Sequence, residues 1–600
     1  MKNSWNQTLK NNIFMLRLIY KACPFIIIVS LLNTLFIAIQ GFLLNVYLYQ
    51  YALNALQEGK KLNEILMIIT LLASFSIACV VYGCWANKYI EVNSPKVSAY
   101  IQHLIQKKAI SVELGCYENP DFYDTYVKAA DEADNRAFSV LNNFCDVIWV
   151  VINILSIGTL IVIIDPIFLF IAFIPLLYSL LFGRKRNKLN YNINMQKKEA
   201  ERKKDYVRRA FCLKDYSKEM RLTEMWRVMI KQMHDSIVEL KTIVEDYGYT
   251  MMWFSYLFDF CLEIVVYSGS IIITAYKTLV QKNMLLGDGY VIINSISNIA
   301  RTINYAGNVF LKLDDNSLYI NNLRLFLDYE VQIKEDMNAP VVPEMQTLDI
   351  CNVGFSYNDH DSATLNNVNL TIQKGEKIAI VGYNGAGKST LVKLLLRFYD
   401  PSEGEILLNG NDIKRYKLSS YRGLFGTIFQ DFCLFAVEVS ENVMLRGHLT
   451  DDDNAVVEKA LESSGALEKI NSLSNGIHSI VTKEFDIDGT VFSGGEAQKI
   501  ALSRIFACEQ EIVILDEPTA ALDPIAEQEL YNNIFEACKN KTVIFISHRL
   551  SSAAMADRIY FFENGWIKEQ GTHAELLATN GRYADMWRKQ AEGYSQNDSY

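Results

Sequence analysis

The 600-residue sequence has no surplus of basic residues, since 58 Lys and Arg stand against 68 Asp and Glu for a formal net charge of -10. Nucleic acid is therefore not an expected partner, because proteins that bind it usually carry a basic surface. The 11 cysteines form no C-x-x-C pair, which argues against a zinc or disulfide framework. Long apolar runs are missing after about residue 310. At least two domains are expected, because 600 residues exceed one hydrophobic core.

Six apolar segments in the first half are long enough to be predicted membrane spans, for which about 20 residues suffice. They cover residues 23–49, 64–86, 143–164, 167–183, 249–276 and 289–311. Long polar helical stretches separate the second span from the third and the fourth from the fifth. These helices are therefore predicted to continue beyond the membrane.

Lys and Arg cluster in the N-terminal tail and between residues 184 and 204. By the positive-inside rule, both termini and both long connections are predicted to be cytoplasmic, in a multi-pass protein of a bacterial plasma membrane. Trp5, Leu9, Ile13, Leu16 and Tyr20 form a helical apolar stripe before the first span. This stripe predicts an elbow helix that lies on the inner membrane face.

The hydrophobic period changes from about Leu348, where short apolar runs alternate with helical segments. This alternation predicts a largely parallel α/β sheet. The predicted organisation is a transmembrane domain over 1–330, a linker over 331–347, a nucleotide-binding domain over 348–590 and a tail over 591–600. The fold class is thus a membrane all-α domain of six transmembrane helices with long cytoplasmic extensions, followed by an α/β P-loop nucleotide-binding domain.

Residues 382–390 match the phosphate-loop pattern G-x-x-x-x-G-K-[ST] between an apolar run and a helical segment. Glycines allow the loop N–H groups to point at phosphate oxygens, and the helix N-terminus adds a positive dipole. Lys388 is predicted to reach the β and γ phosphates and Ser389 to ligate Mg²⁺. The predicted nucleotide contacts of this loop are Gly382, Asn384, Gly385, Gly387, Lys388, Ser389 and Thr390.

Further elements of an ATP hydrolase follow the phosphate loop along the chain. Asp516 ends an apolar strand and is suited to hold Mg²⁺, and Glu517 is placed to orient or deprotonate the attacking water. His548 follows another apolar run, where it could contact a γ-phosphate, and Gln430 could sense metal and water. The predicted catalytic residues are therefore Glu517, His548 and Gln430, with Ser389, Gln430 and Asp516 at the metal.

A second anion site is predicted at Ser493-Gly494-Gly495, which opens another helical segment. Tyr357 could stack on adenine.

In their order and spacing these motifs resemble those of the ATP-binding cassette (ABC) exporter half-transporters, and the resemblance covers essentially the whole chain. It implies that the phosphate loop of one cassette and the Ser-Gly-Gly of another enclose each ATP, so that the chain is half of a homodimer or heterodimer. Ala521-Leu522-Asp523 also fits this family pattern.

The resemblance extends to the membrane half. Residues 117–123 and 216–221 resemble the two cytoplasmic coupling helices that dock on the cassettes. The signature of this family usually reads Leu-Ser-Gly-Gly-Gln, whereas Phe492 and Glu496 stand at its ends here. Glu496 places a negative charge near a bound nucleotide, which would weaken ATP affinity or require a nearby cation. The Gly-Glu-x-Gly that usually precedes the signature is replaced by residues 486–489.

Polar side chains in predicted spans indicate a substrate path, because they are costly in a bilayer. Asn294, Asn298, Arg301, Tyr305 and Asn308 recur at steps of three and four and share one helical face. Asp259 and Glu263 share another face, one turn apart. If the fifth and sixth spans form a hairpin, Glu263 and Arg301 lie at similar depth, either facing a central cavity or bonding helix to helix.

The predicted function is ATP-hydrolysis-driven export of a peptide, lipid or amphiphilic small molecule by alternating access of a dimer in lipid. The expected enzyme class is an ABC-type ATPase coupled to transmembrane movement, with ATP and Mg²⁺ as cofactors. Two alternatives stay open: an importer on the exporter scaffold, and an ATP-gated channel or regulatory membrane protein.

Overall fold

The computed structural model describes residues 5–357, 363–507, 509–518 and 524–595. It contains two compact units. The first consists of Met1–Ile110 and Asp121–Tyr329, and the second of Ser111–Pro120 and Glu330–Tyr600. The second unit therefore includes a ten-residue segment from the first half of the chain.

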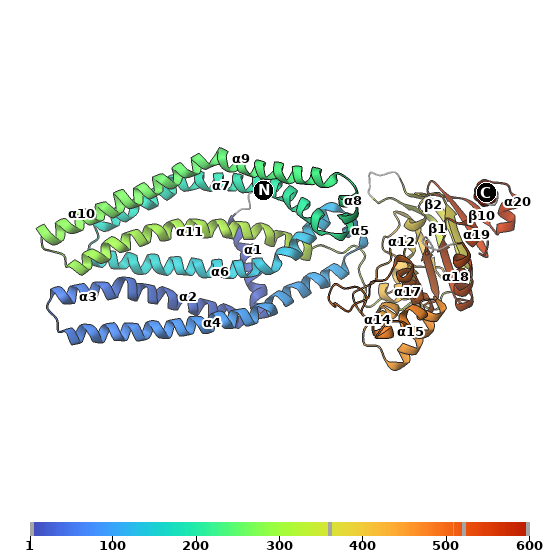
Figure 1. The fold of residues 1–600 in the computed structure, drawn as a ribbon, viewed down its shortest axis with the longest axis horizontal. Coiled ribbons are helices and arrows are strands. Elements are labelled where there is room, and N and C mark those ends of the chain that lie inside the picture. Colours follow the sequence, from blue (N-terminus) through green and yellow to red (C-terminus); the bar gives the residue numbers. More distant parts are fainter. Residues whose placement is uncertain (1–4, 358–362, 508, 519–523, 596–600) are drawn as a thin grey trace. The chain divides into compact units, whose positions relative to one another are not determined.

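The described part of the first unit is helical (Figure 1). Its α-helices are α1 (Trp5–Ala22), α2 (Pro24–Phe42), α3 (Leu48–Gln57), α4 (Leu62–Ser111), α6 (Pro120–Ile164), α7 (Phe168–Cys212), α8 (Ser217–Leu222), α9 (Met225–Phe260), α10 (Gly269–Ala275) and α11 (Leu286–Leu327). Three π-helical stretches are η1 (Leu43–Tyr47), η3 (Cys261–Ser268) and η4 (Tyr276–Val280). Because η1 joins α2 to α3 and η3 joins α9 to α10, six long helical rods result, and the six predicted spans lie on them.

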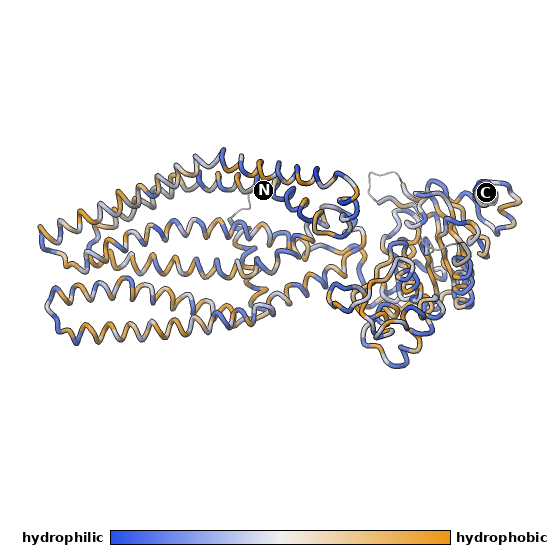
Figure 2. Tube along the Cα trace, in the orientation of Figure 1, coloured by the Kyte–Doolittle hydropathy of each residue, from blue (hydrophilic) through white to orange (hydrophobic). Residues whose placement is uncertain are grey.

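Four of the described helical segments are long and apolar enough to cross a membrane. They are Pro24–Gln57, Leu62–Ser111, Asn135–Ile164 and Met225–Val280, and Figure 2 shows how hydrophobic positions predominate along α2 and the first half of α4. The predicted spans 167–183 and 289–311 lie in α7 and α11, which are not among these four. For α11 the reason is its polar face, which carries Asn298 and Arg301. Residues 165–167 separate α6 from α7, at the boundary between the third and fourth predicted spans.

Helix α1 packs its polar face against α11. Asn11 Nδ2 donates to Ser317 Oγ at 3.0 Å, and Thr8 Oγ1 donates to Asp314 Oδ1 at 2.9 Å. The apolar stripe remains largely exposed, at Trp5, Leu9, Ile13 and Tyr20. An exposed apolar stripe on a helix suits the membrane interface predicted for it.

The second unit contains two sheets. One is antiparallel in the order β2-β1-β4-β5 and consists of β1 (Thr347–Phe355), β2 (Leu365–Gln373), β4 (Glu403–Leu408) and β5 (Asn411–Asp412). The other has the order β10-β9-β3-β8-β7-β6, with β3 (Lys377–Gly382), β6 (Phe425–Ile428), β7 (Ile512–Asp516), β8 (Thr542–Ile546), β9 (Arg558–Glu563) and β10 (Trp566–Gly571). All its pairs are parallel except that of β10 with β9. The predicted parallel sheet is confirmed, whereas the antiparallel sheet was not predicted.

Helices cover the parallel sheet, whose strands β7 and β8 are buried at every residue. The helices of this unit are α12 (Lys388–Leu395), α13 (Leu418–Arg422), α14 (Val439–Met444), α15 (Asp451–Ser463), α16 (Leu467–Asn471), α17 (Gly494–Ala507), α18 (Pro524–Ala537), α19 (Leu550–Ala553), α20 (His573–Ala578) and α21 (Arg582–Ser595). Of these, α14, α15 and α16 pack with α17 in a separate hydrophobic cluster. The segment from the first half adds α5 (Leu114–Glu118). Continuous apolar strands are typical of a parallel sheet buried on both faces.

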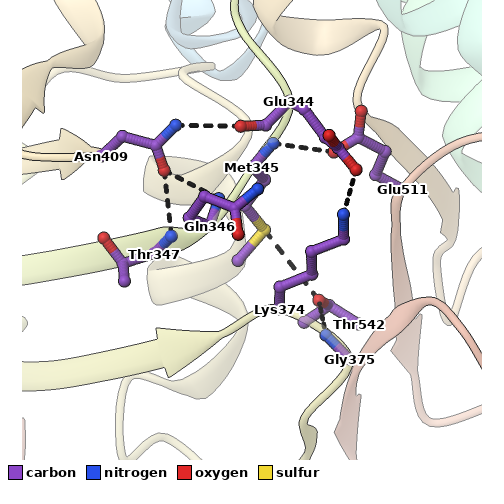
Figure 3. Close-up of polar contacts among 9 residues, drawn as sticks. All are labelled: Glu344, Met345, Gln346, Thr347, Lys374, Gly375, Asn409, Glu511 and Thr542. Carbon is purple, nitrogen blue, oxygen red and sulfur yellow. Dashed lines mark hydrogen bonds and ion pairs between the residues drawn. The ribbon is translucent and has the colours of Figure 1, made fainter.

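Backbone groups at the start of β1 connect the two sheets (Figure 3). The Met345 N–H donates to Glu511 Oε2 at 2.9 Å, just before β7 begins. The N–H groups of Gln346 and Thr347 both donate to Asn409 Oδ1, at 2.8 and 3.0 Å. These bonds satisfy N–H groups at the end of the linker and fix where β1 enters its sheet.

Candidate nucleotide-binding site

The phosphate loop follows β3 and leads into α12, as the motif predicts. Gly382 has φ of 147°, and a Cβ there would lie 2.1 Å from the carbonyl oxygen of Phe562 on β9. Gly387 has φ of 98°, and its Cβ would lie 2.6 Å from Leu365 Cδ2. Glycine is therefore needed at both positions for close approach as well as for backbone conformation.

Lys388 begins α12 and is only 5% exposed. Its ammonium donates to the carbonyl oxygens of Gly382 and Tyr383, at 2.9 and 3.0 Å. Burial lowers the pKa of Lys388, although the nearby carboxylates of Glu517 and Asp516 oppose that shift. A buried ammonium at the start of the helix that follows the loop is suited to bind the phosphates of a nucleotide.

Asp516 ends β7 with 6% of its surface exposed. Burial raises the pKa of its carboxyl, while a hydrogen bond from Ser389 and the charge of Lys388 oppose the rise. Its Oδ1 atom is buried and has no hydrogen-bond partner among the described residues. An unsatisfied buried carboxylate oxygen beside a hydroxyl is the donor set that Mg²⁺ prefers, so Asp516 and Ser389 fit the predicted metal.

Glu517 is the next residue and adopts φ of 49°, which is rare for a residue with a side chain. Backbone strain of this kind is found preferentially at functional sites. One carboxylate oxygen of Glu517 contacts His548 Nε2, and the other accepts from Gln430 Nε2 at 3.1 Å. The structure thus brings together the three residues predicted to be catalytic, from the ends of β6, β7 and β8.

These residues line a cavity of about 400 Å³. Its walls are Thr364, Asn384, Gly385, Ala386, Gly387, Lys388, Ser389, Thr390, Gln430, Glu517 and His548. Thr364 belongs to no motif that could have identified it, and it lies next to the phosphate loop, where a Cβ on Gly387 would be 3.0 Å from its carbonyl oxygen. Residues 521–523 lie outside the described residues.

The signature residues Ser493, Gly494 and Gly495 do not line this cavity. They begin α17, where the Ser493 N–H donates to Glu496 Oε2 at 2.8 Å and the Glu496 N–H donates to Ser493 Oγ at 3.4 Å. This reciprocal pair is a capping box. The same hydrogen bonds, from the backbone first, lower the pKa of Glu496.

Lys469 supplies a cation close to Glu496, one of the two consequences expected of the negative charge there, the other being weaker ATP affinity. Its ammonium lies 3.3 Å from Glu496 Oε1. Because Lys469 lies on α16, 27 positions before Glu496 in sequence, no local pattern pointed to this pair. The extra negative charge at the signature is therefore partly neutralised within the same unit.

Tyr357 follows β1 and is 38% exposed. Its hydroxyl lies 3.1 Å from Thr390 Oγ1 of the phosphate loop. An exposed aromatic ring that is hydrogen-bonded to the phosphate loop is well placed to stack on a nucleotide base.

The helical unit contains a separate cavity of about 570 Å³ between α2, α6 and α11. Asn298, Arg301, Tyr305 and Asn308 line it, in agreement with the polar face predicted for the sixth span. Asn294 does not line it and donates instead to the Tyr290 carbonyl at 3.1 Å. Asp259 is exposed and lies elsewhere. The side chain of Glu263 lies outside the described ones, so its pairing with Arg301 stays a prediction.

Additional polar residues of this cavity were missed. Asn45, Asn153 and Asn304 contribute amide groups, and Trp149 packs edge-to-face on Tyr305 with ring centroids 5.9 Å apart. An adjoining cavity of about 290 Å³ contains Asp146. Asn45, Asn153 and Asp146 are polar residues in predicted spans, the same signal that identified the polar face of the sixth span.

The ABC transporter family matches residues 365–520 of this chain. The chain is 28% identical over 564 residues to the subtilin transport ATP-binding protein SpaT of Bacillus subtilis, with 91% of this chain and 88% of SpaT covered. A Staphylococcus aureus protein named for multidrug export, an ATP-binding/permease protein, is 39% identical over 262 residues, 44% of each chain. The solved structure of a bacterial Atm1-family ABC exporter with ATP bound has the same fold, with a TM-score of 0.74 and 21% identity over 96% of this chain and 98% of that one.

Proposed function

Since this chain is a half-transporter of the ABC exporter type, we propose that two copies bind and hydrolyse ATP together and export a substrate across a bacterial plasma membrane. One relative is named for multidrug export and another for subtilin transport, and the structure with the same fold is that of an ABC exporter. The two-copy assembly, the peptide, lipid or amphiphilic cargo and the cytoplasmic termini are our inferences. A homodimer is proposed because every hydrolytic position predicted from the motifs is filled in this chain.

The observation that carries this proposal is the separation of the two anion sites. Lys388 and Glu517 line one cavity and Asp516 lies near Lys388, whereas Ser493 and the N-terminus of α17 lie outside the cavity lining. A second copy that faces the first head to tail would bring its own signature over this cavity. Mg²⁺ held by Ser389 and Asp516 would neutralise phosphate charge, Lys388 would bind the phosphates and Glu517 would accept the proton of the attacking water.

Mixing two inactive variants tests whether the site is shared. Lys388→Met damages the phosphate loop and Ser493→Arg damages the signature, so either homodimer should have little ATPase activity. In a mixed dimer, one site carries both defects and the other carries none. Random pairing should then restore about a quarter of the wild-type rate, measured as phosphate release after co-reconstitution in lipid. No recovery in the mixture would contradict a composite site in a homodimer.

The cavity between α2, α6 and α11 is proposed as part of the substrate route. Its five asparagines offer both donors and acceptors, and Arg301 adds a positive charge. Among the three candidate cargoes, this lining suits a peptide better than a lipid chain, because amides pair with a peptide backbone. The asparagines are Asn45, Asn153, Asn298, Asn304 and Asn308.

Arg301→Ala should separate transport from hydrolysis. We expect basal ATPase activity to stay within about two-fold of wild type, because Arg301 lies in the helical unit, apart from the nucleotide site. Stimulation of the ATPase activity by a random hexapeptide mixture should fall about ten-fold or more, since the desolvated contact between the Arg301 charge and the peptide is lost. Asn294→Ala, on the same helix but outside the cavity, is the matched control. Equal stimulation in both variants would remove Arg301 from the substrate route.

A further inference from the structure

The segment that joins α4 to α6 packs with the nucleotide-binding unit. Its helix α5 approaches Tyr399 so closely that a Cβ on Gly115 would lie 2.9 Å from Tyr399 Cε1. Before the helix, Glu113 Oε1 accepts the backbone N–H of Ile333 at 2.9 Å. A short connection between two long helices is thus held by specific contacts, not by chain connectivity alone.

Glu118 at the end of α5 binds two residues at once. Its Oε1 atom accepts from Lys393 Nζ at 2.7 Å, and its Oε2 atom accepts from the hydroxyl of Tyr399. Burial raises the pKa of Glu118, but the hydrogen bonds from Lys393 and Tyr399 outweigh burial and lower it. The carboxylate is therefore charged at neutral pH, and both hydrogen bonds are charge-assisted.

Both partners of Glu118 also contact Tyr357. The rings of Tyr399 and Tyr357 pack edge-to-face, with centroids 5.3 Å apart and planes at 87°. Lys393 Nζ lies 5.3 Å from the centroid of the Tyr357 ring. Aromatic edge-to-face and cation–π contacts both depend on ring orientation, so Lys393 and Tyr399 restrain the Tyr357 ring.

We propose that Glu118 is a positioning residue for the adenine base. Through Lys393 and Tyr399, it orients the Tyr357 ring on which the base would stack, so that the connection between α4 and α6 sets the affinity for the base. This inference rests on the proposed role of Tyr357. Because coupling between two sites is reciprocal, a base bound at Tyr357 also stabilises the docked position of α5.

Comparison of ATP with tripolyphosphate, which lacks the base and sugar, tests this inference on the full-length chain. Dissociation constants for both are measured in Mg²⁺ by calorimetry. For Glu118→Gln we expect ATP affinity to fall about three- to ten-fold while tripolyphosphate affinity stays within about two-fold. Tyr399→Phe, which removes only the hydroxyl, should shift ATP affinity in the same direction by less. Glu113→Gln, a carboxylate of the same segment that contacts the linker, should leave the ratio of the two affinities unchanged.

Tyr357→Ala distinguishes failure of the inference from failure of the proposed base site. If Tyr357→Ala weakens the binding of ATP and of tripolyphosphate equally, Tyr357 does not bind the base, and the role assigned to Tyr357 is wrong. If Tyr357→Ala weakens ATP alone but Glu118→Gln leaves the ratio unchanged, the positioning role of Glu118 is wrong. A Glu118→Gln variant that weakens both ligands equally has only a structural effect, which also overturns the proposal.

Discussion

Replacement of Lys388 by methionine is expected to weaken ATP binding at least about 100-fold, which corresponds to about 2.7 kcal/mol. Methionine keeps most of the length of the lysine side chain and removes its charge. Lys388 is the only lysine or arginine among the described residues that line the cavity. Its ammonium is already held by two loop carbonyls, at 2.9 and 3.0 Å, so it is positioned before the phosphates arrive.

Calorimetry with ATP and Mg²⁺ on the purified full-length chain measures this loss. Lys374→Met is a suitable control, because Lys374 pairs with Glu344 on the protein surface and does not line the cavity. The control variant should bind ATP as wild type does. An affinity of Lys388→Met within about three-fold of wild type would contradict the assignment of the phosphate loop.

Replacement of Glu517 by glutamine is expected to lower the ATPase rate by about 100- to 1,000-fold and to leave ATP affinity nearly unchanged. Glutamine has the same shape but cannot accept the proton of the attacking water. The contact with Gln430 can persist, because the amide oxygen still accepts the hydrogen bond seen at 3.1 Å. ATP should therefore bind and remain uncleaved.

Phosphate release and ATP binding must be measured on the same preparation to separate these effects. Glu511→Gln provides a matched control, because Glu511 lies just before β7 whereas Glu517 lies just after it. Glu511 accepts the Met345 N–H and is absent from the cavity lining. A residual Glu517→Gln rate above about a tenth of wild type would show that another group activates the water.

Much of the nucleotide site could be predicted because its parts are local. The phosphate loop, β7 with Asp516 and the strand before His548 are each a continuous segment, and the carboxyl ends of neighbouring parallel strands meet at one edge of a sheet. The antiparallel sheet was missed because its strands lack such a clear local pattern. Its strands β1 and β2 alternate less regularly, and β5 has only two residues.

The helical unit was predictable in its number of rods, because apolar length alone indicates a span. It was less predictable in what the helices enclose. Arg301 was expected either to face a cavity or to bond another helix, but the other polar residues of the lining were not expected: Asp146, Asn153 and Trp149 come from α6 and Asn45 from the π-helical stretch after α2. Such a lining depends on how three helices pack, and periodicity within one helix does not contain that information.

The sequence by itself determined the chemistry at the phosphate loop, since the order of Gly382 to Thr390 dictates a loop of inward N–H groups with Lys388 beneath it. Only the tertiary structure decided which distant residues contact the nucleotide-binding motifs. Lys469 neutralises Glu496 from another helix, and Glu118 reaches Tyr357 through Lys393 and Tyr399. Backbone conformation follows from neighbouring residues, whereas ion pairs and ring contacts form between segments that only packing brings together.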